Sequence, residues 1–271
     1  MVVGSLRQEA ELAVIGSGPG GYVAALRAAD LGKEVTLIEE RERLGGVCLI
    51  EGCIPSKALI TIVELAAAAR EAAKAGLTFD NLTIDPRALR QWTESVISGL
   101  TQGIGGLLKR RGVEVIRGRA RFDSPRSLML ENSEIAGIDF RECVIATGSR
   151  INELPPAYNL PVWSSAEALQ IPEVPQRLLV VGGGYIGLEM GLVYAGLGSK
   201  VTLVEFFPRL LTGADPDLVN VVVKNCEKKF ESILVESKVV GVEQTSSGFA
   251  VTIEHQGETR TDEFNQVLVA I

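Results

Sequence analysis

One supersecondary pattern occurs twice in this chain and constrains its fold more than any other feature. The first copy is ELAVIGSGPGGYVAALRAADLGKEVTLIEE (residues 11–40), and the second is RLLVVGGGYIGLEMGLVYAGLGSKVTLVEFF (residues 177–207). Each copy has a short apolar run, a G-x-G-x-x-G turn, a helix of apolar periodicity, a glycine turn and a β-branched strand followed by glutamate. That order is typical of a βαβ unit. The repeat therefore predicts a doubly wound α/β architecture with two similar domains.

The glycines and the glutamate of each copy suit a bound dinucleotide. The first glycine permits the tight turn, the second lets the backbone approach a diphosphate, and the third allows close helix–strand packing; these are Gly16, Gly18 and Gly21, and Gly182, Gly184 and Gly187. The helix N-terminus then offers N–H groups to the diphosphate. Glu39 and Glu205 suit a ribose 2′-hydroxyl, and Glu205 would repel a 2′-phosphate, which favours NAD over NADP. An ordinary strand–helix turn is the alternative, but here the whole βαβ context occurs twice.

Length and composition indicate a globular protein of two domains. The chain has 271 residues, of which 46% are hydrophobic and 23% charged, and its net charge is −7. This acidic balance argues against a nucleic-acid partner, because phosphate binding needs a basic surface. We expect no membrane span, and the opening MVVGSLRQEAEL lacks the long apolar run of a signal peptide. These features favour a cytoplasmic protein.

The two copies predict two Rossmann-like dinucleotide-binding domains, one over residues 1–155 and one over residues 156–271. Two dinucleotide sites imply two dinucleotides, for which FAD and a nicotinamide nucleotide are the natural pair. The proline-rich stretch at 151–161 resembles a crossing between domains. Apolar patterns elsewhere predict helices at 57–76, 86–112 and 215–232, and strands at 113–122, 127–132, 143–149, 233–244, 248–257 and 266–271.

Residues 45–57, GGVCLIEGCIPSK, contain a close cysteine pair, Cys48 and Cys53. Such a pair could be a structural staple, half of a metal site or a working redox dithiol. A metal site is not expected, because the chain has one histidine, His255, and no second close cysteine pair. Cys143 and Cys226 are interpreted as structural.

Five segments together resemble the pyridine nucleotide–disulfide oxidoreductase family. They are GSGPGGYVAA, GGVC-x4-CIPSKAL, GLTQGIGGLLKRRGVEVIRG, VIATGS and RLLVVGGGYIGLEMG, and the resemblance covers essentially the whole chain after residue 10. Within the family, CIPSKAL and Glu205 are more similar to the dihydrolipoamide dehydrogenase group than to glutathione or mercuric reductases. Ile50 stands where the family usually has asparagine, which leaves the dithiol spacing intact.

The resemblance implies roles for the residues around the dithiol. Cys48 and Cys53 would form a redox-active disulfide against the flavin ring, with Cys48 exchanging with lipoamide and Cys53 facing the flavin as a thiolate. Lys57 and Glu189 would form a buried ion pair near flavin N5, which is credible because both partners are present. Tyr185 matches a residue that can cover the nicotinamide pocket, although a core tyrosine is the alternative.

The resemblance also implies a set of cofactor-binding positions. For FAD these are Gly16, Gly18, Pro19, Gly20, Gly21, Glu39, Gly46, Val47, Lys57, Ala120, Thr147, Gly148 and Ser149. For NAD they are Gly182, Gly184, Tyr185, Ile186, Gly187, Glu189, Glu205 and Val239, although Val239 could equally be a plain strand valine.

The family's whole enzymes oxidise dihydrolipoamide and transfer hydride to NAD through FAD. The resemblance implies a dihydrolipoyl domain of a 2-oxo acid dehydrogenase or glycine cleavage complex as partner, and a homodimer. The family's C-terminal dimerisation domain, with its catalytic histidine, is expected to be missing after QVLVAI, so this chain looks truncated and nearly inactive alone. His255 lies in a polar stretch expected to be a turn or exposed edge. A non-catalytic nucleotide-binding or redox-carrier protein is the alternative.

Overall fold

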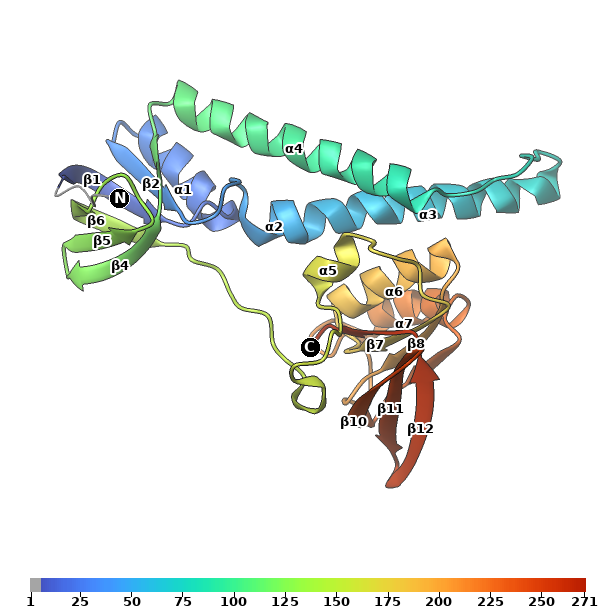
Figure 1. Cartoon of the computed structure of the whole chain (residues 1–271). Helices are drawn as coiled ribbons and strands as arrows, with labels where there is room; N and C mark the ends of the chain where they lie inside the picture. The colour runs from blue at the N-terminus through green and yellow to red at the C-terminus, as the bar shows by residue number, and fades with distance from the viewer. Residues whose placement is uncertain (1–5) are drawn as a thin grey trace. The chain divides into compact units, whose positions relative to one another are not determined.

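The computed structural model describes residues 6–271, which form two compact units (Figure 1). The first unit contains the chain up to Pro55 together with Glu94–Arg150, and the second contains Ser56–Thr93 and Ile151–Ile271. The change at residue 150 lies close to the expected boundary, but the assignment of residues 56–93 differs from the expected division. The reason is packing, because Leu59 and Leu89 are buried in the core of the second unit.

The first unit is built on a six-stranded sheet with the order β3-β2-β1-β6-β5-β4. Its parallel strands are β1 (Arg7–Ile15), β2 (Val35–Glu39), β3 (Glu114–Arg117) and β6 (Gly137–Ile145). Two antiparallel strands, β4 (Arg119–Ser124) and β5 (Ser127–Glu131), complete one edge. The helical elements in this half of the chain are α1 (Pro19–Asp30), α2 (Gly46–Glu51), α3 (Cys53–Ala72), η1 (Ala73–Ala75) and α4 (Pro86–Arg110).

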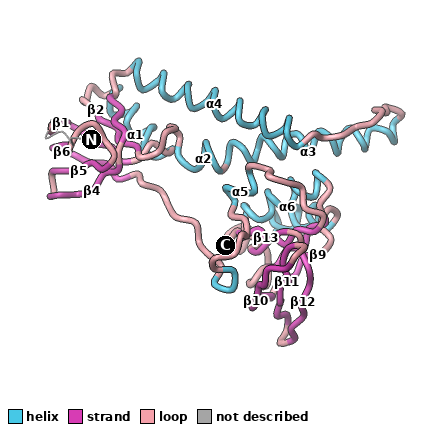
Figure 2. The backbone as a smooth tube through the Cα atoms, in the orientation of Figure 1, coloured by secondary structure: helices cyan, strands magenta, loops and turns pink. Residues whose placement is uncertain are grey.

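The second unit has a four-stranded parallel sheet with the order β13-β7-β8-β9. These strands are β7 (Arg177–Val181), β8 (Lys200–Val204), β9 (Ser232–Leu234) and β13 (Gln266–Val269). A separate antiparallel sheet contains β10 (Ser237–Thr245), β11 (Gly248–His255) and β12 (Glu258–Phe264). The helical elements are η2 (Pro155–Ala157), α5 (Ser165–Leu169), α6 (Tyr185–Leu197) and α7 (Pro216–Glu227). Figure 2 shows the stretch between β6 and α5 as loop, interrupted by the helical turn η2.

The predicted α/β architecture with a parallel βαβ unit in each half is confirmed. In each copy of the repeat the two strands are parallel neighbours, with Leu12 opposite Val35 in the first and Arg177 opposite Lys200 in the second. The glycine that ends each first strand, Gly16 or Gly182, has a φ of +97° or +113°. Such a backbone favours glycine strongly, which explains the tight turn into each helix.

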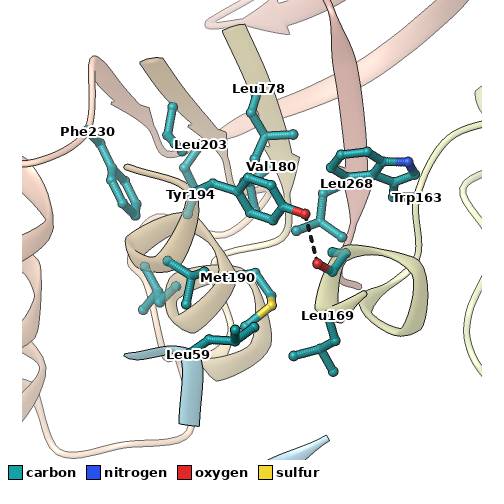
Figure 3. Packing of buried hydrophobic residues seen from close by; sticks show 14 of the residues in the cluster. Leu59, Trp163, Leu169, Leu178, Val180, Met190, Tyr194, Leu203, Phe230 and Leu268 are labelled. Atoms are coloured by element: carbon teal, nitrogen blue, oxygen red, sulfur yellow. Dashed lines mark hydrogen bonds between the residues drawn. The ribbon is translucent and has the colours of Figure 1, made fainter. Parts of the chain in front are cut away.

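Alternate residues of β7 face two different cores. Leu178 and Val180 pack with the helices, whereas Leu179 and Val181 pack with the three-stranded sheet. This follows from the two-residue period of a strand. In the helical core, Tyr194 is fully buried, its ring lies 5.5 Å from that of Trp163, and its hydroxyl donates to the Ala168 carbonyl at 2.8 Å (Figure 3). Burial raises the pKa of Tyr194, and the charge of Glu173 adds to the effect.

The secondary structure differs from the expectations in several places. The strands expected at 113–122 and 233–244 are each two strands, β3 with β4 and β9 with β10. Strand β12 and helix α5 were not predicted, and β6 covers Gly137–Ile145 instead of residues 143–149. Strand β12 is a mostly exposed edge strand with the sequence ETRTDEF, so it carries little of the apolar signal that identifies strands. Helix α5 has only five residues, but the sequence contains its capping box. The Ser164 hydroxyl accepts from the Ala166 N–H, and the Glu167 carboxylate accepts from the Ser164 N–H.

One described stretch, Gly46–Ala75, is long and apolar enough to cross a membrane by length and composition. This differs from the expectation that no segment resembles a membrane span. The stretch comprises three elements, α2, α3 and η1, and its side chains Leu49, Leu59 and Val63 are buried within the protein. Of the most apolar window of this stretch, 28% is buried.

Candidate functional site

A cavity of about 660 Å³ lies at the first glycine turn. Eleven of the predicted FAD positions line it, and so does Cys48: Gly16, Gly18, Pro19, Gly20, Glu39, Gly46, Val47, Ala120, Thr147, Gly148 and Ser149. Gly21 lies behind this wall, where an added Cβ would be 1.7 Å from the Gly16 carbonyl oxygen. Lys57 belongs to the second unit. The first turn therefore gathers residues that are far apart in the sequence around one space.

Glu39 anchors the first glycine turn to the end of β2. Its Oε2 accepts hydrogen bonds from the Ser17 N–H at 2.8 Å and the Ser17 hydroxyl at 2.5 Å, and its Oε1 accepts from the Arg41 N–H at 2.9 Å. The residue is only 8% exposed. A carboxylate has about four acceptor sites, so about one remains for a ribose hydroxyl.

A second cavity, of about 440 Å³, lies at the second glycine turn. Four predicted NAD positions line it, namely Gly182, Gly184, Glu205 and Val239. Tyr185, Ile186, Gly187 and Glu189 are outside its lining. Tyr185 is 68% exposed, so the alternative of a core tyrosine is wrong. An added Cβ at Gly187 would lie 2.0 Å from the Gly182 carbonyl oxygen, which repeats the close packing of Gly21.

Glu205 holds the second turn as Glu39 holds the first. Its Oε2 accepts from the Gly183 N–H at 2.5 Å and its Oε1 from the Phe207 N–H at 2.8 Å, and the residue is 8% exposed. These two bonds leave about two of the four acceptor sites of the carboxylate for hydroxyl groups of a ligand. Lys238, which also lines this cavity, forms an ion pair with Glu254 at 3.2 Å.

The middle glycine of each turn is not required by the packing of the chain itself. Gly18 and Gly184 have φ of −66° and −76°, which other residues adopt readily. An added Cβ would meet nothing within 4 Å at Gly184, and only the Gly46 Cα, at 3.8 Å, at Gly18. Both glycines cap helices that have no side-chain cap and no acidic residue in the first turn. This open space beside helix N–H groups fits the diphosphate of a dinucleotide.

The cysteine pair flanks the junction of α2 and α3. Cys48 is half-buried and Cys53 is exposed. Gly52 separates the two helices, and a Cβ added there would lie 3.2 Å from the Cys48 Cα. Cys143 and Cys226 were interpreted as structural, and burial raises the pKa of both thiols. Raised pKa values disfavour the thiolate needed for exchange. Among residues 6–271 no cluster of three or more His, Cys, Asp or Glu side chains could hold a metal ion.

Lys57 and Glu189 are brought together, but not as a buried pair. Lys57 Nζ lies 3.3 Å from Glu189 Oε1, with side-chain exposures of 63% and 29%. The expectation that this ion pair is buried is therefore wrong for Lys57, because its long side chain extends into solvent. The Ser56 hydroxyl donates to Glu189 Oε2 at 2.7 Å. This serine lies next to Lys57 in CIPSKAL, and sequence reasoning missed it.

Sequence reasoning also missed charged and aromatic residues at the two cavities. Arg41, Arg119 and Arg150 line the first, where Arg41 pairs with Glu51 at 2.9 Å. Phe206 and Phe207 line the second. A signal was available in the sequence, because Arg41, Phe206 and Phe207 lie within two residues of Glu39 or Glu205.

His255 does not lie in a turn or on an edge strand, so that expectation is wrong. It ends β11, the middle strand of the antiparallel sheet, and is half-buried. The turn begins one residue later, at Gln256 and Gly257, which both have positive φ. His255 Nδ1 lies 2.7 Å from the hydroxyl oxygen of Ser237, which lines the second cavity.

Comparison with known proteins identifies relatives of this chain. A dihydrolipoyl dehydrogenase of Vibrio parahaemolyticus is 42% identical over 267 residues, which are 97% of this chain and 56% of that protein. A dihydrolipoyl dehydrogenase of Geobacillus stearothermophilus is 41% identical over 273 residues, which are 100% of this chain and 58% of that protein. The HOCl-induced flavoprotein disulfide reductase RclA of Escherichia coli superposes with a TM-score of 0.79 at 25% identity, over 96% of this chain and 56% of that one.

The chain thus spans somewhat more than half of the length of the curated relatives it matches. The family model described as pyridine nucleotide-disulphide oxidoreductase matches residues 10–271, which is nearly the whole chain. This chain belongs to the pyridine nucleotide-disulphide oxidoreductase family.

Proposed function

We propose that the chain carries the FAD-binding and NAD-binding parts of a flavoprotein that oxidises protein-bound dihydrolipoamide. The observation that carries this proposal is the pair of glycine turns, each with a nucleotide-sized cavity and an anchored glutamate, with Cys48 in the lining of the first cavity. The identity of about two fifths to dihydrolipoyl dehydrogenases favours this substrate over other disulfides.

The chain's own contribution to the chemistry is thiol–disulfide exchange at Cys48 and Cys53. A lipoyl thiolate attacks the Cys48 sulfur, which forms a mixed disulfide and releases Cys53 as a thiolate. The second lipoyl thiol then displaces Cys48, which leaves cyclic lipoamide and a reduced dithiol. Two electrons thereby pass from substrate to protein. FAD, when bound, would accept this electron pair and deliver it to NAD as hydride.

Each cavity has residues that suit its proposed cofactor. In both, the open side of Gly18 or Gly184 leaves room for a diphosphate at the helix N-terminus. Glu205 has acceptor sites left for a ribose 2′-hydroxyl, and its negative charge would repel a 2′-phosphate. We therefore propose NAD over NADP at the second cavity. Replacing Glu205 by serine should weaken NADH binding and raise the relative affinity for NADPH, as titration of both nucleotides would show.

The proposal extends to partners and location. The dihydrolipoyl domain of a 2-oxo acid dehydrogenase or glycine cleavage complex would present the substrate, the whole enzyme would be a homodimer, and it would work in the cytoplasm. The names of the curated relatives support the dihydrolipoyl group as substrate. The thiol reaction needs a base to take a proton from dihydrolipoamide, and histidine is the usual one. The single histidine of the chain, His255, instead has its Nδ1 against the Ser237 hydroxyl. We therefore expect residues 1–271 alone to turn over dihydrolipoamide slowly.

Counting thiols tests the proposal directly. The chain has four cysteines, so an intact Cys48–Cys53 disulfide leaves two thiols titratable after denaturation, and reduction by dihydrolipoamide raises this to four. Cys48→Ser should abolish the dihydrolipoamide-dependent increase. Four thiols before any reductant is added, in protein purified under air, would contradict a redox disulfide. An increase with glutathione equal to that with dihydrolipoamide would instead favour a general disulfide reductase.

A further inference from the structure

Helix α2 carries Cys48 but has little of its own to hold it in place. It is six residues long, Gly46–Glu51, with Gly45 before it and Gly52 after it, and no side chain caps its N-terminus. Helices this short are marginal without contacts to the rest of a protein, and glycine is the residue with the most backbone freedom. The position of Cys48 therefore depends on what the side chains of α2 contact.

The C-terminal half of α2 has both apolar and polar contacts. Leu49 is buried in an apolar core of the first unit, and the half-buried Ile50 packs against the same core. Glu51, the last residue of the helix, forms an ion pair with Arg41. Arg41 Nη1 lies 2.9 Å from Glu51 Oε2, and the side-chain exposures are 43% and 32%. The ion pair therefore holds α2 at the point where the helix ends.

The end of a helix disfavours the charge of Glu51. A carboxylate at this position lies beside unpaired carbonyl groups, where the helix dipole is negative. The cation of Arg41 offsets this repulsion. The backbone of Arg41 is itself held, because its N–H donates to Glu39 Oε1 at 2.9 Å. The Glu51 carboxylate is thus tied to the turn that follows β2.

The chain turns back on Cys48 directly after this ion pair. A Cβ added at Gly52 would lie 3.2 Å from the Cys48 Cα and 3.0 Å from the Val47 carbonyl oxygen. Cys53 follows as the first residue of α3. A disulfide needs its two Cα atoms about 4.4–6.8 Å apart and a narrow range of dihedral angles. A small displacement of the end of α2 therefore changes how readily Cys48 and Cys53 bond.

We infer that Arg41 and Glu51 are positioning residues for the proposed redox pair, and that their ion pair favours the Cys48–Cys53 disulfide over the dithiol. The inference rests on the proposed function for the redox role of the cysteines. Without the ion pair, the end of α2 is looser in the dithiol state, so closing the disulfide has the added cost of ordering it. An exposed ion pair changes an equilibrium by about 1.5- to 5-fold.

The test is the equilibrium of the 271-residue chain with buffers of oxidised and reduced dithiothreitol. Closing the disulfide bonds the two sulfurs and passes two electrons and two protons to oxidised dithiothreitol, which becomes its dithiol. After acid quenching and denaturation, the intact mass of the alkylated protein gives the fraction with two rather than four modified cysteines. Glu51→Gln and Arg41→Gln should each shift the equilibrium toward the dithiol by about 1.5- to 5-fold, and the double variant should shift it no further.

A charge exchange and a matched control sharpen the test. The variant Arg41→Glu/Glu51→Arg places the same two charges in opposite positions and should restore the wild-type equilibrium. Arg43→Gln is the control, because it breaks another exposed ion pair of the first unit. Arg43 lies 2.8 Å from Glu94 on α4, with side-chain exposures of 34% and 52%. Its equilibrium should match that of wild type.

The outcomes separate the inference from the proposed function. If the wild-type disulfide forms and Glu51→Gln leaves its equilibrium unchanged, the positioning role is overturned and the proposed redox pair stands. An equal shift in Arg43→Gln would assign the effect to the stability of the whole unit and overturn the inference. If both single variants shift the equilibrium and the charge exchange does not restore it, the separate charges act on the thiols and the ion pair does not, which also overturns it. Four modified cysteines in every buffer would overturn both the inference and the proposed function.

Discussion

The two copies of the βαβ repeat share a backbone and differ in the side chains around it. In both, a buried glutamate at the end of the second strand accepts an N–H from two residues further on, Arg41 or Phe207, at 2.9 and 2.8 Å. In the first copy the residue after the turning glycine is Ser17, whose hydroxyl adds another bond to Glu39. The second copy has Gly183, where a Cβ would lie 2.4 Å from the Leu210 side chain.

The helices of the two copies differ in the same way. At the position of Ala28 in α1, α6 has Tyr194, which is fully buried and bonded to the Ala168 carbonyl. At the position of Val23, which is exposed, α6 has Glu189, which is held by Ser56 and Lys57. The comparison teaches that the glycine positions determine how a chain turns around a diphosphate. The residues between them determine what else each copy can bind and bury.

The largest expected effect comes from the third glycine of each turn. A Cβ at Gly21 or Gly187 would lie 1.7 or 2.0 Å from a backbone carbonyl oxygen, and backbone cannot move aside as a side chain can. Alanine at either position should destabilise its own unit by about 3 kcal/mol or more. Chemical denaturation followed by circular dichroism measures this. Gly20→Ala is the control, since its Cβ would meet the Ala146 side chain at an ordinary 3.8 Å. Equal losses in Gly20→Ala and Gly21→Ala would contradict the packing argument.

The middle glycine should behave in the opposite way. Alanine at Gly18 or Gly184 requires no unusual φ and meets no close atom, so the free energy of unfolding should stay within about 0.5 kcal/mol of wild type. A methyl group in the space proposed for a diphosphate should weaken the matching dinucleotide by about 10- to 100-fold. FAD retention tests Gly18→Ala and ADP-ribose titration tests Gly184→Ala. Each variant should leave the other site unchanged, and unaltered binding at its own site would refute the diphosphate assignment.

A smaller effect is expected from making the first copy resemble the second at the residue after the turn. Ser17→Ala removes the hydroxyl bond to Glu39, and with it the longer bond that the hydroxyl accepts from the Gly45 N–H at 3.3 Å. The bond from the backbone N–H to Glu39 stays, as at Gly183. A hydrogen bond to a charged group contributes about 1.5–3 kcal/mol, so the first unit should lose stability of that size. Thermal denaturation measures it, with the second unit as internal reference. The reverse change, Gly183→Ser, should be worse because of the contact with Leu210. Equal tolerance at both positions would show that the difference between the copies has no structural cause.

Local patterns in the sequence predicted the repeat, the glycine turns and both glutamates, because each depends on residues close together in the chain. The grouping of residues 56–93 with the second unit was not predictable, since it depends on tertiary packing of Leu59 and Leu89. The same limit explains the exposed Lys57 and the bond between His255 and Ser237, because exposure and cross-strand partners arise only when distant elements pack. Phe206 and Phe207 follow Glu205 in the sequence, but only the structure shows that they line a cavity.

The smallest expected effect concerns Tyr194, the buried phenol that the first copy replaces with Ala28. Tyr194→Phe removes the hydrogen bond to the Ala168 carbonyl, which should cost about 1 kcal/mol near pH 7. Burial raises the pKa of Tyr194 in the folded protein, so the unfolded chain releases this proton first, near pH ~10. The stabilisation by neutral Tyr194 is therefore complete below about pH 10 and is lost as the pH rises further, by up to about 1.4 kcal/mol per pH unit.

Phenylalanine at position 194 has no such proton, so its stability should not include this alkaline loss. The variant should therefore be less stable than wild type at pH 7, and the difference should shrink above pH ~10 and reverse near pH ~11. Urea denaturation between pH 7 and 11 gives both curves. Tyr185→Phe is the control, because Tyr185 occupies the first position of the same helix and is 68% exposed, so its curve should run parallel to wild type. A constant difference between wild type and Tyr194→Phe across this range would mean that Tyr194 ionises as readily in the folded protein as in the unfolded chain.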